Sequence, residues 1–291
     1  MKVGLIQHSN TQQIKDNLHY ILEQIDLLAA QGAELVVLQE LHNCLYFCQT
    51  ESSQYFDMAE PLDGPTSQAL ASSAKENQIV IVGSIFEKRR HGVYHNTAIV
   101  MDKDASMAGY YRKMHIPDDP GYYEKYYFTP GDTGFTPITT SIGKLGVLIC
   151  WDQWFPEAAR LMALAGAEVL IFPTAIGWDA RDTQQERTRQ LDAWMTIQRS
   201  HAIANNIPVI SINRVGHEPD ESEQTSGIEF WGNSFACDAM GKIIYQCSAD
   251  KNQNIIVDLD LNETEQQRLI WPYFRDRRVD AYSDINKRSI D

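Results

Sequence analysis

The stretch from Gly143 to Trp178 reads GKLGVLICWDQWFPEAARLMALAGAEVLIFPTAIGW, and the rest of the chain is interpreted outward from it. Leu145 to Ile149 is a nearly unbroken apolar run, which predicts a strand buried on both faces. Pro156 and Glu157 indicate the start of a helix, because proline has no N–H to leave unsatisfied and a carboxylate suits the positive end of the helix dipole. Gly166 is placed to end that helix, and another apolar strand is predicted after it.

The position of Cys150 indicates a catalytic nucleophile. It follows the predicted strand directly, and polar Asp152 and Gln153 come next. At such a junction a side chain stands clear of the sheet, and backbone N–H groups near the helix start can hold an oxyanion. An isolated cysteine in an apolar run is usually a small core residue. The sheet-edge position beside polar residues favours the nucleophile here.

The composition predicts a soluble cytoplasmic protein with neither nucleic-acid nor membrane partners. The 291 residues are 43% hydrophobic, and 25 basic against 39 acidic residues give a net charge of −14, which disfavours phosphate contacts. No apolar run approaches the ~20 residues that span a membrane, and the first ten residues lack the apolar centre of a signal peptide. Reduced thiols are expected, because the cysteines form no CxxC pair: Cys44, Cys48, Cys150, Cys237 and Cys247.

Glu40 occupies the same kind of position as Cys150. Lys2 to Gln7 predicts a first strand, Thr11 to Gly32 an amphipathic helix, and Glu34 to Leu38 a second buried strand that ends at Gln39 and Glu40. A carboxylate at the end of an apolar strand is usually a solvated loop residue. The shared strand-end position makes Glu40 a candidate site residue.

The remaining chain alternates strands and helices, with hairpins that predict mixed sheets. A charged hairpin is expected over Glu87 to Tyr94, a long helix over Gln184 to Asn205, and a polar loop over Asn213 to Ser226. Leu41 to Pro65 and Ile116 to Gly134 are long irregular segments rich in aromatic residues. Loops of that length are often functional, so both are expected to form pocket walls.

The sequence predicts neither a metal nor a cofactor. It has no Cys/His cluster with zinc spacing, no GxGxxG and no GxxxxGK[ST] phosphate loop. A cysteine nucleophile needs a base, and histidine is the usual one. His8, His42 and His115 are therefore alternatives, although none lies at a clear strand end with an acidic partner.

Several segments together resemble the nitrilase superfamily of carbon-nitrogen hydrolases. VVLQE with Glu40, YRKMHIP with Lys113 and LGVLICWDQWFPEAAR with Cys150 are similar to the segments that carry the family's Glu-Lys-Cys triad. Glu124 in EKYYFTPGD matches the family's additional glutamate, and PTAIGW and VISINRVG extend the resemblance over nearly the whole chain.

The resemblance implies an α/β fold, a four-layer α-β-β-α sandwich in which two mixed sheets pack face to face between helices. It also implies roles for the matched residues. Glu40 is expected to be the general base. Lys113 is expected to favour the thiolate and, with the backbone N–H of Trp151, to hold the oxyanion. Glu124 is expected to orient Lys113.

The expected substrate is a small ureido-amine. CWDQWFPEAAR and PTAIGW resemble family members that remove a carbamoyl group from such amines, and the first basic residue after Cys150 is Arg160, whereas a substrate carboxylate calls for a nearby arginine. The segments expected at the pocket are acidic, which suits a cation. The acidic residues of these segments are Asp118, Asp119, Asp179, Asp182 and Glu186. Of these, we expect Asp179 and Glu186 to bind the amine.

Two other functions remain open at this point. One is hydrolysis of a carbamoyl-amino acid or a ureidopropionate. The other is a catalytically silent, nitrilase-like binding protein, which the intact set of Glu40, Lys113, Glu124 and Cys150 argues against.

We expect residues 1–291 to form a single domain and, from the resemblance, a homo-oligomer. The helix from Pro156 to Gly166 and the aromatic tail from Trp271 to Arg278 are the expected contacts, within a C-terminal part that begins at about residue 262. A tail without a core face of its own needs another surface to pack against.

Overall fold

The structure is a computed structural model that describes residues 1–220 and 222–291. Its first sheet has six strands in the order β15-β1-β2-β3-β4-β5. β1, β2 and β3 are parallel, and the other pairings are antiparallel, so the sheet is mixed as predicted. The strands are β1 Lys2–Gln7, β2 Leu35–Val37, β3 Val80–Arg90, β4 Val93–Met101, β5 Met107–Arg112 and β15 Gln253–Asp258.

The second six-stranded sheet has the order β14-β13-β10-β8-β7-β6. Its central strands β7, β8 and β10 are parallel, and antiparallel strands flank them. The strands are β6 Ile138–Thr140, β7 Gly143–Val147, β8 Val169–Pro173, β10 Val209–Ile212, β13 Phe235–Cys237 and β14 Ile243–Gln246.

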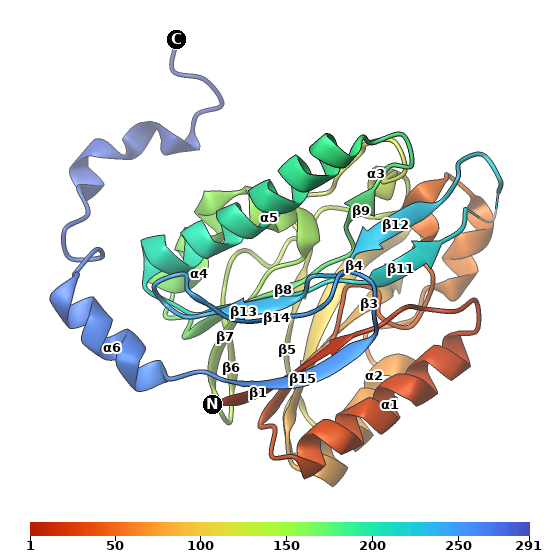
Figure 1. Ribbon diagram of the computed structural model, residues 1–291, viewed down its shortest axis with the longest axis horizontal. Helices are drawn as coiled ribbons and strands as arrows, with labels where there is room; N and C mark the ends of the chain where they lie inside the picture. The colour runs from red at the N-terminus through yellow and green to blue at the C-terminus, as the bar shows by residue number, and fades with distance from the viewer. Residues whose placement is uncertain (221) are drawn as a thin grey trace.

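Helices cover the outer face of each sheet (Figure 1). α1 (Ile14–Ala30) and α2 (Pro65–Asn77) pack on the first sheet, whereas α4 (Pro156–Leu164) and α5 (Gln184–Asn205) pack on the second. The inner faces of the sheets meet in one apolar cluster that contains Leu35 and Val37, while Val36 points the other way, toward the helices. This alternation confirms the predicted four-layer α-β-β-α sandwich.

A small third sheet forms where a polar loop was predicted. β11 (Val215–Glu218) pairs with β12 (Ile228–Trp231), and β12 pairs with β9 (Gly177–Trp178). The loop prediction was wrong because these strands are short and carry polar residues whose partners are distant in sequence. The charged hairpin was also placed too broadly: β3 continues to Arg90, because the charge of Glu87 is neutralised by Arg112 on β5.

After α6 (Leu261–Ile270) the C-terminal residues run beside α4 and α5 before the chain ends (Figure 1). The Arg160 guanidinium lies 5.3 Å from the centre of the Phe274 ring, and Tyr273 and Tyr282 line a cavity together with Arg199 of α5. At the end of α6 and in the residues after it, several apolar side chains remain exposed, including Leu269 at 79% and Ile270 at 70%. Among the described residues, no helix combines the length and the apolar character needed to cross a membrane.

Candidate active site

Cys150 opens a short 3-10 helix, Cys150–Trp154, between β7 and α4. Its φ of 42° lies in the left-handed region, which is uncommon for a residue with a side chain and is concentrated at functional sites. The Cys150 thiol donates a weak hydrogen bond to the carbonyl of Ala175, which follows β8, with a sulfur–oxygen distance of 3.8 Å. The predicted strand–turn–helix placement of the nucleophile is thus present, although the strand ends at Val147.

Asp152 fastens this turn to the neighbouring sheet. Its Oδ2 accepts hydrogen bonds from the Ile149 N–H and the Tyr111 hydroxyl, both at 2.9 Å. Its Oδ1 accepts from the N–H of His115 at 3.0 Å and lies 2.7 Å from that residue's ring Nδ1. Since Tyr111 and His115 flank Lys113 in sequence, Asp152 couples the position of the nucleophile to that of the lysine.

Lys113 joins two carboxylates in the interior. Its Nζ donates to Glu40 Oε1 at 2.8 Å and to Glu124 Oε2 at 2.7 Å, and all three residues are at most 1% exposed. Glu40 follows β2, Lys113 follows β5, and Glu124 begins the short helix α3 (Glu124–Tyr127). The fold therefore brings together the predicted Glu40, Lys113 and Glu124, and the charges of all three act on the Cys150 thiol.

Two further donors fix the carboxylates. The side-chain amide of Asn96 donates to Glu40 Oε1 at 2.6 Å, and the Tyr46 hydroxyl donates to Glu124 Oε1 at 2.7 Å. Glu40 Oε1 thus has two donors, whereas Glu40 Oε2 is buried and has no hydrogen-bond partner among the described residues. Oε2 is the oxygen available to accept a proton.

The protonation of the site follows from burial. Burial and the charge of Glu40 raise the pKa of Cys150 well above its ordinary value, despite Lys113, so the resting group is a thiol. Burial alone would lower the pKa of Lys113, but Glu124 and Glu40 outweigh it and hold that pKa well above its usual range. Burial raises the pKa of Glu124 to about 7, even though Lys113 opposes the shift.

A cavity of about 550 Å³ opens onto Cys150. That volume lies within the range of small-molecule sites. Glu124, Trp151, Trp154, Tyr122 and Trp231 contribute to the lining, and the Tyr122 hydroxyl is hydrogen-bonded to both the N–H and the carbonyl of Gly177. The cavity combines an aromatic wall with the reactive thiol.

The charged residues at the cavity only partly match those predicted. Asp179 lines it, but Arg181 binds both of its oxygens, at 2.8 and 2.6 Å, and lowers the pKa of Asp179 to about 2. Glu186 does not line the cavity and pairs instead with Arg189, which does.

Asp119 and Asp182 also line the cavity, and neither forms an ion pair with any described residue. Asp182 accepts hydrogen bonds from the N–H of Asp179 at 3.1 Å and the side-chain amide of Gln190 at 3.2 Å. These two carboxylates are therefore available to a cationic ligand.

The alternative of a histidine base finds no geometric support. The His115 ring is bound to Asp152 and stacks on Phe155 with centroids 3.7 Å apart. His8 and His42 are fully buried, and burial lowers the pKa of His8 to about 4 and of His42 to about 3, so both are neutral near pH 7. Among the described residues, no group of three or more His, Cys, Asp or Glu side chains is arranged to hold a metal ion.

A buried cysteine near a lysine and two carboxylates, between two facing mixed sheets, is an arrangement suited to a hydrolase of carbon–nitrogen bonds. The chain belongs to the carbon-nitrogen hydrolase family, whose model matches residues 2–269.

Individual members of this family and one solved structure are similar to the chain over nearly its whole length. The chain is 41% identical over 283 residues to "N-carbamoylputrescine amidase" of Solanum lycopersicum, covering 96% of this chain and 93% of the relative. It is 38% identical over 289 residues to "Citrullinase" of Francisella tularensis, covering 99% of both. Among solved structures it matches a carbon-nitrogen hydrolase from Helicobacter pylori with a TM-score of 0.97 and 48% identity, over 100% of this chain and 99% of that one.

Proposed function

We propose that the protein hydrolyses N-carbamoylputrescine to putrescine, carbon dioxide and ammonia, and so supplies a polyamine. The observation that carries this proposal is the cavity in front of Cys150, where Asp119 and Asp182 form no ion pair with a described residue and lie with three tryptophans. An ammonium group at the end of a short aliphatic chain suits such a wall through ion pairing and cation–π contact. The similarity to the Solanum lycopersicum enzyme supports the same substrate.

The first chemical step is acylation of Cys150. Glu40 takes the thiol proton on Oε2, and the thiolate attacks the ureido carbon. Lys113 and the backbone N–H of Trp151 hold the oxyanion that forms. Ammonia leaves with the proton returned by Glu40, so Cys150 retains a thioester-like S–C(=O)–NH–R group.

The second step is hydrolysis of that intermediate. Glu40 removes a proton from water, the hydroxide adds to the carbonyl carbon, and the C–S bond breaks to restore the thiol. The released N-carboxy-amine loses carbon dioxide and yields putrescine. Glu124 stays hydrogen-bonded to Lys113 in both steps, so its role is to hold the side-chain ammonium group of Lys113 in place.

A comparison of kcat/KM among candidate substrates tests the proposal. The substrates are N-carbamoylputrescine, citrulline, N-carbamoyl-β-alanine and a carbamoyl-D-amino acid. We expect the highest kcat/KM for N-carbamoylputrescine, because the free charges at the cavity are carboxylates. A higher value for any of the amino acids would contradict the proposed substrate and leave the chemistry at Cys150 in place.

Matched variants test which carboxylate binds the amine. Asp182→Asn removes a charge that lines the cavity, whereas Glu186→Gln removes a nearby charge that does not line it. We expect Asp182→Asn to raise KM for N-carbamoylputrescine by roughly tenfold, with Glu186→Gln close to wild type. Asp119→Asn and Asp118→Asn form a second such pair. The reverse order would restore Glu186 as the binding residue.

Citrulline is a second candidate because Arg181 and Arg189 also line the cavity. Citrulline carries a carboxylate as well as an ammonium group, and a cavity with arginines and aspartates can receive both. The 38% identity to the Francisella tularensis citrullinase supports this alternative. If citrulline is the substrate, Arg189→Gln lowers its kcat/KM; if N-carbamoylputrescine is, the same change leaves its kcat/KM unchanged or raises it.

We also propose that the protein is a homo-oligomer. Leu161 and Leu164 on α4 are each 45% exposed, and Trp271 in the tail is 46% exposed, so both predicted contact regions present apolar surface. Light scattering of the full chain at micromolar concentration is expected to give a multiple of the 33.1 kDa monomer mass. A monomer mass would refute the proposal.

A further inference from the structure

We propose that Arg214 and Glu218 form a positioning pair that holds residues 40–46 so that both active-site carboxylates face Lys113. The inference rests on the proposed Glu40–Lys113–Cys150 chemistry and adds a pair that the proposed mechanism does not use. Arg214 lies between β10 and β11, Glu218 ends β11, and their side chains are at most 1% exposed.

Arg214 binds main-chain carbonyl groups of Glu40 and of the residues that follow it. One of its terminal nitrogens, Nη2, donates to the carbonyls of Glu40 at 3.0 Å and Leu41 at 2.6 Å. The other, Nη1, donates to the carbonyl of Cys44 at 2.8 Å and to Glu218 Oε1 at 2.7 Å. A planar guanidinium can reach these acceptors at once, whereas an ammonium group is a single point.

Glu218 extends the same hold to the second carboxylate. Its Oε2 accepts the backbone N–H of Tyr46 at 2.6 Å, and the Tyr46 hydroxyl in turn donates to Glu124 Oε1 at 2.7 Å. The pair therefore acts at both ends of residues 40–46. Arg214 binds the Glu40 carbonyl at the start of the segment, and Glu218 binds the N–H of Tyr46, which contacts Glu124, at its end.

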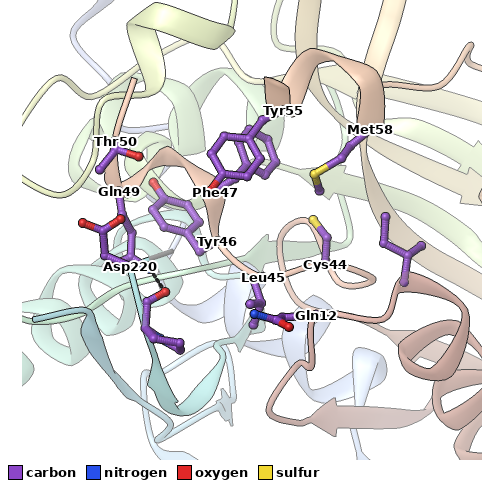
Figure 2. A pocket seen from close by; sticks show the side chains of 12 residues that line it. Gln12, Cys44, Leu45, Tyr46, Phe47, Gln49, Thr50, Tyr55, Met58 and Asp220 are labelled. Atoms are coloured by element: carbon purple, nitrogen blue, oxygen red, sulfur yellow. Dashed lines mark hydrogen bonds between the residues drawn. The ribbon is translucent and has the colours of Figure 1, made fainter. Parts of the chain in front are cut away.

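The segment needs such a hold because its conformation is unfavourable by itself. Leu41 has a φ of 47°, in the left-handed region that branched side chains rarely adopt. The segment of residues 40–46 also borders a second cavity, of about 220 Å³, whose wall includes Cys44, Tyr46 and Gln49 (Figure 2). The buried hydrogen bonds to Arg214 and Glu218 define its path together with those that Asn17 donates to the Asn43 carbonyl and that Ser84 accepts from the Leu41 N–H.

The contribution of the pair is geometric. Arg214 and Glu218 have opposite charges, so together they add no net charge to the site. Arg214 reaches Glu40 through a hydrogen bond to its main-chain carbonyl, and Glu218 reaches Glu124 through Tyr46. A displacement of about 1 Å in a catalytic group can cost roughly 10²-fold in rate.

Arg214→Lys tests the inference because it keeps the charge and removes the planar fork. Arg112→Lys is the matched control: Arg112 is 5% exposed and binds both oxygens of Glu87, at 2.8 and 2.7 Å, without contacting residues 40–46. Both variants are compared with wild type after circular dichroism and thermal melts establish that they are folded.

We expect Arg214→Lys to lower kcat by roughly 10²-fold with KM within about twofold of wild type, because the cavity wall is intact. The alkylation rate of Cys150 by iodoacetamide, followed by peptide mass spectrometry, falls in parallel. Arg112→Lys retains kcat within a few-fold. Equal losses in the two variants, or a loss confined to KM, overturn the inference.

A second variant covers the case in which Arg214→Lys does not fold. Glu218→Gln keeps Arg214 and its carbonyl contacts but has one acceptor oxygen in place of two, so its amide NH2 faces either the Tyr46 N–H or Arg214 Nη1. It is judged by the same criteria. Alkylation requires no substrate. A wild type that alkylates at Cys150 yet does not turn over N-carbamoylputrescine therefore contradicts the proposed substrate, while the variants still decide the role of the pair.

Discussion

Replacing Lys113 with Met should destabilise the protein strongly, by an amount that depends on pH. The change removes the 2.8 Å and 2.7 Å hydrogen bonds to Glu40 and Glu124. Both carboxylates, which are at most 1% exposed, then lose the cation that neutralised them. Breaking a buried ion pair from one side costs about 3–5 kcal/mol. Asn96 and Tyr46 still donate to the carboxylates, so we expect a loss of about 4 kcal/mol at about pH 8.

The pH dependence follows from proton uptake. In Lys113→Met the two carboxylates repel each other without compensation, so at least one has a raised pKa in the folded state and an ordinary pKa in the unfolded state. Folded protein then binds more protons, and its stability rises as the pH falls. One proton taken up over about two pH units, at 1.36 kcal/mol per unit, stabilises the variant by about 2.7 kcal/mol. Over the same interval the wild type is itself stabilised by about 1.4 kcal/mol through Glu124, whose pKa is about 7, so the difference between the two proteins shrinks by about 1.4 kcal/mol.

Urea unfolding of wild type and Lys113→Met at about pH 8 and about pH 6 measures both quantities. We expect the difference in unfolding free energy to shrink from about 4 to about 2.5–3 kcal/mol between the two conditions. A difference below about 1 kcal/mol at both pH values would refute the reasoning, because it would mean that water already solvates the carboxylates. Arg112→Lys again serves as a control, since its loss should not shrink in this way.

Two further predictions concern titration. The kcat/KM of the wild type should fall as the pH drops through about 7, because burial raises the pKa of Glu124 to about 7 and its protonation removes a carboxylate that holds Lys113. In Glu124→Gln this acid limb should no longer lie near pH 7, and an unmoved limb would assign it to another group. The protein should also lose stability below pH 6.5, because the pKa of His8 is lowered to about 4 in the folded state, so the unfolded state binds more protons in this window. His8→Gln should reduce the loss between pH 6.5 and about pH 5 by about 2 kcal/mol in urea unfolding, and an unchanged slope would contradict this assignment.

The sequence was sufficient for the parts of the site that lie at strand ends or in recognisable motifs. Cys150 and Glu40 each follow an apolar run, and local chain chemistry marks such positions. Lys113 and Glu124 carry no local signal of that kind, and the family resemblance identified them. The alternation of strands, helices and hairpins predicted mixed sheets, and the resemblance implied their arrangement as a sandwich.

The supporting contacts could not be predicted because they join residues distant in sequence. Asn96 lies within β4 and donates to Glu40 across 56 positions, and Tyr46 reaches Glu124 across 78. Arg214 did carry a usable signal. It follows the apolar run of β10 closely, as Glu40 follows that of β2.

The assignment of charges at the cavity failed for a different reason. Asp179 and Glu186 were expected to bind an amine, but each forms an ion pair with an arginine close by in sequence. Asp179 pairs with Arg181, and Glu186 pairs with Arg189. Acidic residues near basic ones therefore predict local pairs better than ligand contacts. Asp182 belongs to the same segment but has no ion-pair partner among the described residues, which a count of charges could not reveal.

Covalent trapping at Cys150 tests the central claim most directly. Wild type, Cys150→Ser and Glu40→Gln are treated with an electrophilic carbamoyl reagent, and peptide mass spectrometry locates the adduct. We predict an adduct on Cys150 in the wild type, none at that position in Cys150→Ser, and formation slowed by roughly 10²-fold or more in Glu40→Gln, because the base is lost. Labelling of Cys44, Cys48, Cys237 or Cys247 with Cys150 untouched would contradict the account.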